Sequence, residues 1–266
     1  MARTRLVLDF LTRGRSFRYG PHRSQRADLY LPRGAGPHPL MVVIHGGSWQ
    51  RRYGKIVMRG LAGDLVRRGW AVWNIEYRRV GEGGGWPATF EDVAAAIDHL
   101  ATLEQPLDLD SVSVLGHSAG GHLALWAAGR EHLPDGAPGA SPAISFKRAI
   151  SQAGVCDLAG AYRRWRGGAA AALMGGSPQE LPERYALGDP LALIPLALPV
   201  LLVHGVIDTT VSVELSRRYA GQSRAAGGDV ELVEIEGAAG GHRAHIDPRG
   251  EAWRVVTSWL RQPVGV

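Results

Sequence analysis

One stretch of ten residues constrains the fold of this chain most. Residues 112–121 read Val-Ser-Val-Leu-Gly-His-Ser-Ala-Gly-Gly, and a helix-forming run, Leu123 to Ala128, follows directly. A strand, a sharp turn and a helix around Gly-x-Ser-x-Gly are the context of a nucleophile elbow. The glycines fit this reading, because a Cβ at Gly116 or Gly120 would clash in so tight a turn. We predict that Ser118 is a nucleophile, with an ordinary Gly/Ser turn as the alternative.

Strands and helices alternate along most of the remaining chain. Apolar runs typical of strands lie at residues 28–32, 40–44, 70–75, 149–152, 199–205 and 230–235, and helices are expected at about 53–68, 89–100, 212–226 and 251–261. Thr89 is expected to cap the second of these helices. This alternation predicts an α/β fold with a doubly wound, mostly parallel sheet of about eight strands flanked by helices.

The length of 266 residues and the hydrophobic content of 45% suit one domain over residues 1–266. Residues 1–25 carry several arginines and little apolar pattern, so an N-terminal arm is expected there. The alternation lapses over residues 158–194, which contain three prolines. We predict that this segment forms a small helical cap over the site.

A serine hydroxyl becomes a good nucleophile only when a histidine takes its proton and an acid orients that histidine. In this fold type both should follow the serine, each in a loop after a strand. Asp208 follows the strand at 199–205, and His242 lies in a glycine-rich loop after the last strand. Asp157 also follows a strand and is the alternative acid. His245 is the alternative base, although it is expected to be a packing or surface residue.

A second motif, His-Gly-Gly-Ser-Trp at residues 45–49, follows the strand at 40–44. Small residues there would let the backbone N–H groups of Gly47 and Ser48, with that of Ala119, bind a developing oxyanion. The alternative is a simple Gly-Gly turn. Trp49 is a candidate wall of the substrate pocket or a purely structural aromatic, and His117 is expected to line or buttress the elbow.

Charge and composition exclude several classes of partner. The net charge is +5, but the basic residues are scattered and almost all are arginines, so no nucleic-acid partner is predicted. No metal is predicted, because the ten histidines show no ligand spacing, and no other cofactor is expected, because the glycines at 81–86 do not form a phosphate-binding loop. With one cysteine and no long apolar stretch, we expect no membrane partner and a cytoplasmic monomer or homodimer.

Taken together, these motifs resemble those of small single-domain α/β-hydrolases with a His-Gly-Gly-x-Trp oxyanion loop. That group includes carboxylesterases, acetyl-xylan and feruloyl esterases, and arylformamidases such as kynurenine formamidases. The resemblance covers about residues 26–262. Its motifs are His45–Trp49, Trp86-Pro87, Gly116–Gly121, His204-Gly205 with Asp208, and Gly241-His242 with Ile246-Asp247-Pro248.

The resemblance implies a carboxylesterase that cleaves small to medium acyl or aryl esters through an acyl-enzyme intermediate. An arylformamidase with the same residues is the alternative, and a non-catalytic binding protein is a third. The chain departs from the pattern at three sites: Ser48 replaces the third glycine of lipase-like relatives, Val211-Ser212 stand where a proline is common, and Arg243-Ala244 stand where relatives tend to have an aromatic residue and an acid.

Overall fold

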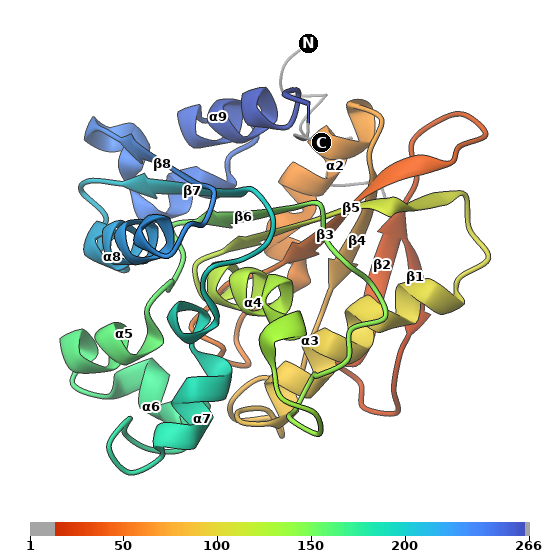
Figure 1. Ribbon diagram of the computed structural model, residues 1–266. Helices are drawn as coiled ribbons and strands as arrows, with labels where there is room; N and C mark the ends of the chain where they lie inside the picture. Colours follow the sequence, from red (N-terminus) through yellow and green to blue (C-terminus); the bar gives the residue numbers. More distant parts are fainter. Residues whose placement is uncertain (1–13, 264–266) are drawn as a thin grey trace.

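The apolar runs form one sheet in the computed structural model, which describes residues 14–263 (Figure 1). Within that range the sheet has eight strands in the order β1-β2-β4-β3-β5-β6-β7-β8. The strands are β1 (Arg15–Arg18), β2 (Arg26–Tyr30), β3 (His38–Ile44), β4 (Ala71–Ile75), β5 (Leu107–His117), β6 (Arg148–Gln152), β7 (Val200–Gly205) and β8 (Val230–Ile235). The pairs β1–β2 and β2–β4 are antiparallel and the others are parallel, which confirms the predicted mostly parallel sheet.

Helices cover both faces of the sheet (Figure 1). The α-helices are α2 (Arg59–Arg67), α3 (Ala88–Asp98), α4 (Ala119–Ala128), α5 (Leu158–Trp165), α6 (Gly168–Met174), α7 (Pro182–Gly188), α8 (Val213–Ala225) and α9 (Glu251–Trp259). Short 3₁₀ helices are η1 (Lys55–Met58), η2 (His99–Thr102), η3 (Arg130–His132), η4 (Pro190–Leu193), η5 (Gly237–Gly240) and η6 (His242–Ile246).

Two cores result, one on each side of the sheet. Successive side chains of a strand point to opposite faces. In β3, therefore, Val42 belongs to the core that includes residues of α3, α4 and α8, whereas the next residue, Val43, belongs to the core that includes residues of α2 and α9. Trp126 is among the large side chains of the first core and Trp253 among those of the second. This arrangement leaves the carboxyl ends of the parallel strands free to carry polar loops.

Two local expectations were wrong. Residues 15–18, expected in an N-terminal arm, form the edge strand β1, whose Phe17 ring packs 5.6 Å from that of Trp73; residues 1–13 of that arm lie outside the described range. Thr89 does not cap a helix. Helix α3 begins one residue earlier, and the Thr89 hydroxyl accepts a hydrogen bond from the Gly85 N–H and donates one to the Arg78 carbonyl.

The segment between β6 and β7 contributes no strand and contains α5, α6 and α7, which group together at one corner of the molecule (Figure 1). Their role as a cap remains a prediction. Across residues 14–263, no helix combines the length and the apolar character needed to cross a bilayer.

Candidate active site

Ser118 lies between β5 and α4, in a backbone conformation that few non-glycine residues adopt. Its φ is 57° and its ψ is −123°. A Cβ on Gly116 would lie 1.9 Å from the Gly120 carbonyl oxygen, and one on Gly120 would lie 2.1 Å from that of Ile44. Only glycine can occupy either position without a backbone shift. The Ser118 N–H donates to the Gln152 carbonyl of the neighbouring strand at 2.9 Å, which anchors the turn to the sheet.

Two successive hydrogen-bond contacts join Asp208 to His242 and His242 to Ser118. The Nδ1 atom of His242 is 2.7 Å from Oδ2 of Asp208, and its Nε2 is 3.0 Å from the Ser118 hydroxyl oxygen. An ionised carboxylate only accepts, so Nδ1 carries the proton and Nε2 is left free to accept from the serine. The three residues come from the ends of β5, β7 and the loop after β8.

The carboxyl of Asp208 is held in its ionised form. Burial would raise its pKa, but hydrogen bonds from His204, His242 and the backbone outweigh burial and hold that pKa well below its usual value. Oδ1 accepts from the N–H groups of Thr210 and Val211, at 2.8 and 3.0 Å. These contacts fix the carboxylate, and its Oδ2 faces His242 at 2.7 Å and His204 at 3.5 Å.

The loop after β3 approaches the elbow closely. A Cβ on Gly46 would lie 2.5 Å from the His117 carbonyl oxygen, so a larger residue would push the loop away from Ser118. Gly47, Ser48 and Trp49 then follow with positive φ angles of 119°, 53° and 55°. Within residues 14–263, the N–H groups of Gly47, Ser48 and Ala119 donate to no protein acceptor, so they are available to an added oxygen.

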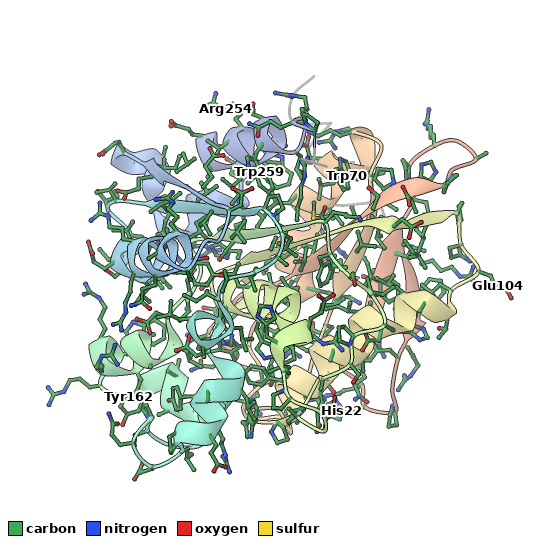
Figure 2. The ribbon with its side chains drawn as sticks, in the orientation of Figure 1. His22, Trp70, Glu104, Tyr162, Arg254 and Trp259 are labelled. Carbon is green, nitrogen blue, oxygen red and sulfur yellow. The ribbon has the colours of Figure 1, made fainter. Side chains whose placement is uncertain are left out.

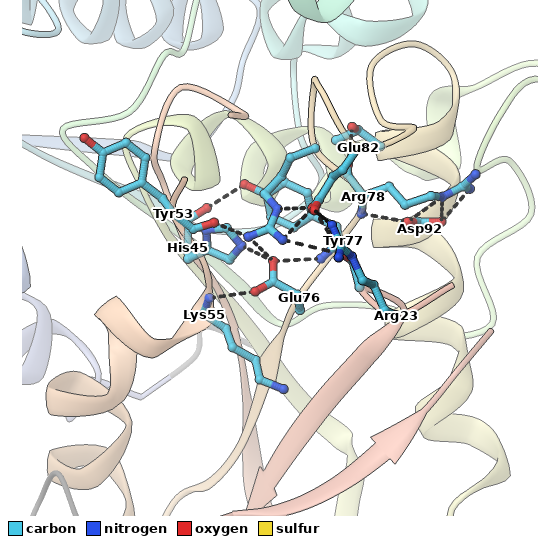
Figure 3. Close-up of polar contacts among 12 residues, drawn as sticks. Arg23, His45, Tyr53, Lys55, Glu76, Tyr77, Arg78, Glu82 and Asp92 are labelled. Atoms are coloured by element: carbon cyan, nitrogen blue, oxygen red, sulfur yellow. Dashed lines mark hydrogen bonds and ion pairs between the residues drawn. The ribbon is translucent and has the colours of Figure 1, made fainter. Parts of the chain in front are cut away.

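A buried polar network braces this loop from behind (Figure 3). The His45 ring contacts the Gly46 carbonyl through Nδ1 and Oε1 of Glu76 through Nε2, both at 2.7 Å. The Tyr77 hydroxyl donates to the His45 carbonyl at 2.9 Å, and the two rings stack with centroids 4.5 Å apart. Burial would raise the pKa of Glu76, but His45 and Arg79 lower it, so the carboxylate stays charged. Sequence reasoning missed Glu76 and Tyr77.

Two hollows adjoin Ser118. One, of about 160 Å³, is walled mainly by apolar side chains and by the Ala119 end of α4: Trp49, Val155, Trp165, Ala169 and Val211. The other, of about 210 Å³, lies on the His242 side, and its side-chain walls include Tyr53, Val57, His117, Arg243 and Ile246. Ser48, Ser118 and Thr210 line both. A molecule held at Ser118 can therefore extend in two directions.

The other candidates lie where they could not replace the first choices. Asp157 accepts from the Gly160 N–H at the start of α5 and lies 3.3 Å from Nε of Arg218. His245 is fully buried, and neither of its ring nitrogens has a partner in the described part of the chain. No contact joins either residue to Ser118 within residues 14–263.

His117 and Trp49 have structural contacts as well as a place at the hollows. The Nε2–H of His117 donates to the His242 carbonyl at 2.9 Å, and the two rings lie 4.7 Å apart. Burial lowers the pKa of His117 to about 3, so this ring is neutral beside His242. Trp49 is buried and packs edge-on against His122, 5.2 Å away, while lining the smaller hollow.

No metal-binding arrangement is found in the part of the chain that the structure describes. There, no group of three or more His, Cys, Asp or Glu side chains is placed to hold a metal ion.

Comparison with known proteins gives three results. A family model described as BD-FAE matches residues 27–222. A probable isoprenylcysteine alpha-carbonyl methylesterase of Arabidopsis thaliana is 26% identical over 249 residues, covering 84% of this chain and 50% of that protein. A kynurenine formamidase of Danio rerio is 31% identical over 107 residues, covering 40% of this chain and 35% of that protein. The chain thus spans about half the length of the plant relative and about a third of the length of the fish relative.

Among solved structures, esterase B from Lactobacillus rhamnosis matches with a TM-score of 0.78 and 21% identity, covering 98% of this chain and 90% of that one. At this identity the likeness shows a shared fold. The predicted α/β-hydrolase architecture is therefore confirmed.

Proposed function

Because this chain belongs to the BD-FAE family, we propose that it is a carboxylesterase, cleaving small to medium acyl or aryl esters through an acyl-enzyme intermediate. One observation carries the proposal: the continuous contacts from Asp208 through His242 to Ser118, at 2.7 and 3.0 Å. The esterase names among its relatives support the same reaction class.

In the first half of the proposed reaction, Ser118 Oγ attacks the ester carbonyl carbon as its proton passes to Nε2 of His242. The resulting imidazolium is stabilised by the charged carboxylate of Asp208. The carbonyl oxygen becomes an oxyanion that accepts hydrogen bonds from the N–H groups of Gly47, Ser48 and Ala119. His242 then gives its proton to the leaving oxygen, the carbon–oxygen bond breaks, and the alcohol departs.

In the second half, water occupies the position that the alcohol has left. His242 takes a proton from the water as its oxygen attacks the acyl carbon, and the same N–H groups hold the second oxyanion. Collapse breaks the bond to Ser118 Oγ, which recovers its proton from His242, and the acid is released. Each proton is transferred through one nitrogen, so the neutral tautomer fixed by Asp208 is required in both halves.

The two hollows have different roles in this scheme. The leaving oxygen must reach His242, so the alcohol portion lies in the 210 Å³ hollow on the histidine side, and we call this the leaving-group hollow. The acyl portion then extends into the 160 Å³ hollow beside Ala119 and Trp165, which we call the acyl hollow. Its volume suits a short acyl chain rather than a long one.

A second candidate is an arylformamidase, which the partial likeness to kynurenine formamidase favours. The same residues would act on a formamide, with an amine as the leaving group. A formyl group would leave the acyl hollow nearly empty, so a formamide substrate would fill less of this hollow than a short-chain ester does.

The test is hydrolysis of p-nitrophenyl esters from acetate to decanoate, run beside N-formylkynurenine. If the protein is a carboxylesterase, it should hydrolyse esters strongly, with an optimum at short acyl chains, and show little deformylation. Preferential deformylation would instead establish the arylformamidase. Ser118→Ala is the control, since it should remove nearly all turnover, a loss on the order of 10⁶. Turnover that survives this substitution would refute the proposed nucleophile.

A further inference from the structure

We propose that the leaving-group hollow selects esters whose alcohol or phenol portion carries an anionic group, and that Arg243 recognises the anion. This proposal rests on the proposed function, because it assigns the substrate class of the same site. It concerns Arg243, the residue that directly follows His242.

The first support is the position of Arg243. It directly follows His242 in η6 and lines the leaving-group hollow. Its side chain is exposed at the mouth of the hollow rather than buried against the core. A group attached to the leaving oxygen would therefore pass Arg243 on its way out of the site.

The second support is that the Arg243 guanidinium is unused. Within residues 14–263 it has no hydrogen bond and no ion pair. Two buried or half-buried arginines, by contrast, are engaged: Arg78 with Asp92, and Arg130 with Asp98. A free guanidinium offers a planar fork of donors that matches a carboxylate or phosphate geometrically, so the unpaired side chain is equipped to bind an anion.

The third support is the charge around the hollow. No aspartate or glutamate is among its lining residues. The nearest acid along the chain, Asp247, is engaged by the N–H and Nε of Arg249, and Asp208 is engaged by His242. An anion in this hollow would meet no opposing carboxylate at its walls.

A second cation, Arg52, contacts Tyr53, one of the residues that line the hollow. The Arg52 guanidinium stacks over the Tyr53 ring, with 5.0 Å between its central carbon and the ring centroid, and Tyr53 lines the hollow. Arg52 likewise has no acidic partner among the described residues. Tyr53, Val57 and Ile246 supply the apolar wall on which the carbon frame of an alcohol can rest. The hollow thus suits an aryl or alkyl group that ends in an anion.

The acyl hollow shows no such character. Its walls carry no charged side chain and are dominated by Trp49, Trp165 and Val211. The asymmetry assigns the anionic group to the alcohol side of the ester and leaves the acyl side neutral.

The experiment compares two acetates of the same ring, 4-acetoxybenzoate, which is anionic, and its methyl ester, which is neutral. The measured quantity is the ratio of their kcat/KM values in the wild-type protein, Arg243→Gln, Arg243→Lys and Arg254→Gln. Because every protein is given the same two esters, the difference in leaving-group acidity cancels when ratios are compared. Arg254 is the matched control, an exposed arginine on α9 at the outer edge of the molecule (Figure 2).

We expect Arg243→Gln to lower the anionic-to-neutral ratio about 5-fold to 10-fold, as suits one charge-assisted contact in a solvent-exposed site. Arg243→Lys should recover part of the loss, because the charge remains but the fork does not. Arg254→Gln should keep the wild-type ratio. Raising the salt concentration from about 20 mM to about 500 mM should lower the wild-type ratio more than that of Arg243→Gln.

Two outcomes would overturn the proposal in different ways. If the wild-type protein hydrolyses the neutral ester but Arg243→Gln keeps the wild-type ratio within twofold, the anion preference is refuted and the carboxylesterase stands. If neither acetate nor any p-nitrophenyl ester is hydrolysed, the proposed function fails, and the substrate class assigned here fails with it.

Discussion

Replacement of His245 by leucine should make the protein more resistant to acid. His245 is fully buried, and its two ring nitrogens have no partner in the described part of the chain. Burial lowers its pKa to about 4. The charges of His204 and His242 lower it further, whereas Asp208 and the nearby Gly240 backbone oppose them. The folded protein therefore holds this ring neutral at a pH where the unfolded chain would protonate it.

The size of the effect follows from this difference. Below its ordinary value of about 6.5, the unfolded histidine binds a proton that the folded one does not, so stability falls as the pH falls from about 6.5 to about 4. One pKa unit corresponds to about 1.4 kcal/mol, so His245 removes about 3 kcal/mol over the full window and about 2 kcal/mol between pH 7.5 and pH 5. Leucine has no proton to bind, so this part of the acid sensitivity should vanish.

At neutral pH the substitution should cost little. Leucine fills a volume close to that of the ring, and it removes two buried polar atoms that have no hydrogen bond to compensate their lost hydration. The Gln152 amide donates to the His245 backbone carbonyl, and that contact does not depend on the side chain.

Urea unfolding followed by tryptophan fluorescence at pH 7.5 and pH 5 measures both quantities, with equal slopes in urea as the check that the unfolded states are comparable. His245→Leu should lose about 2 kcal/mol less than the wild-type protein between the two pH values. The reasoning is refuted if both proteins lose the same stability, or if the variant is destabilised by more than about 2 kcal/mol at pH 7.5.

Three further outcomes are expected. Asp208→Ala should lower kcat by about 10⁴, whereas Asp157→Ala should change it far less; steady-state kinetics with p-nitrophenyl acetate decides, and the reverse ranking would reassign the acid. His242→Ala should abolish nearly all turnover in the same assay while His245→Ala keeps most of it, and equal losses would contradict the assigned base. Gly116→Ala should cost more than about 3 kcal/mol of unfolding free energy, because its Cβ would lie 1.9 Å from a carbonyl oxygen. Gly221→Ala, whose Cβ meets nothing on the surface of α8, should stabilise the protein by about 0.5–1 kcal/mol; urea unfolding measures both variants, and a comparable loss at both glycines would refute the steric argument.

The parts of the fold that sequence could predict are those in which a residue pattern is local. The run before Gly116 and the helix after Ser118 lie side by side in the chain, so their order alone predicted the elbow. The strand at Val230–Ile235 has the bounds expected for it. By contrast, β1 contains one apolar residue, Phe17, and is held by pairing with β2 and by contact with Trp73. No local sequence pattern predicts those contacts.

The candidate site shows the same limit. Asp157 and Asp208 both follow a strand, and only the packing of η6 against β7 brings His242 to one of them. Glu76 lies 31 residues from His45 and has no motif of its own, yet it holds the ring behind the oxyanion loop. Such residues are found by identifying the hydrogen-bond partner of each ring nitrogen of a buried histidine.

The position of α5, α6 and α7 in the chain affects how a protein with this fold could acquire new substrates. The three helices enter between β6 and β7, and two of their residues, Trp165 and Ala169, wall the acyl hollow. The residues that bond to His242 lie elsewhere, on the sheet and its loops. Exchange of this one insertion, by recombination or grafting, would therefore change the walls of the acyl hollow as a unit. Ser118, Asp208 and His242 would keep their positions, because none of them lies in the insertion.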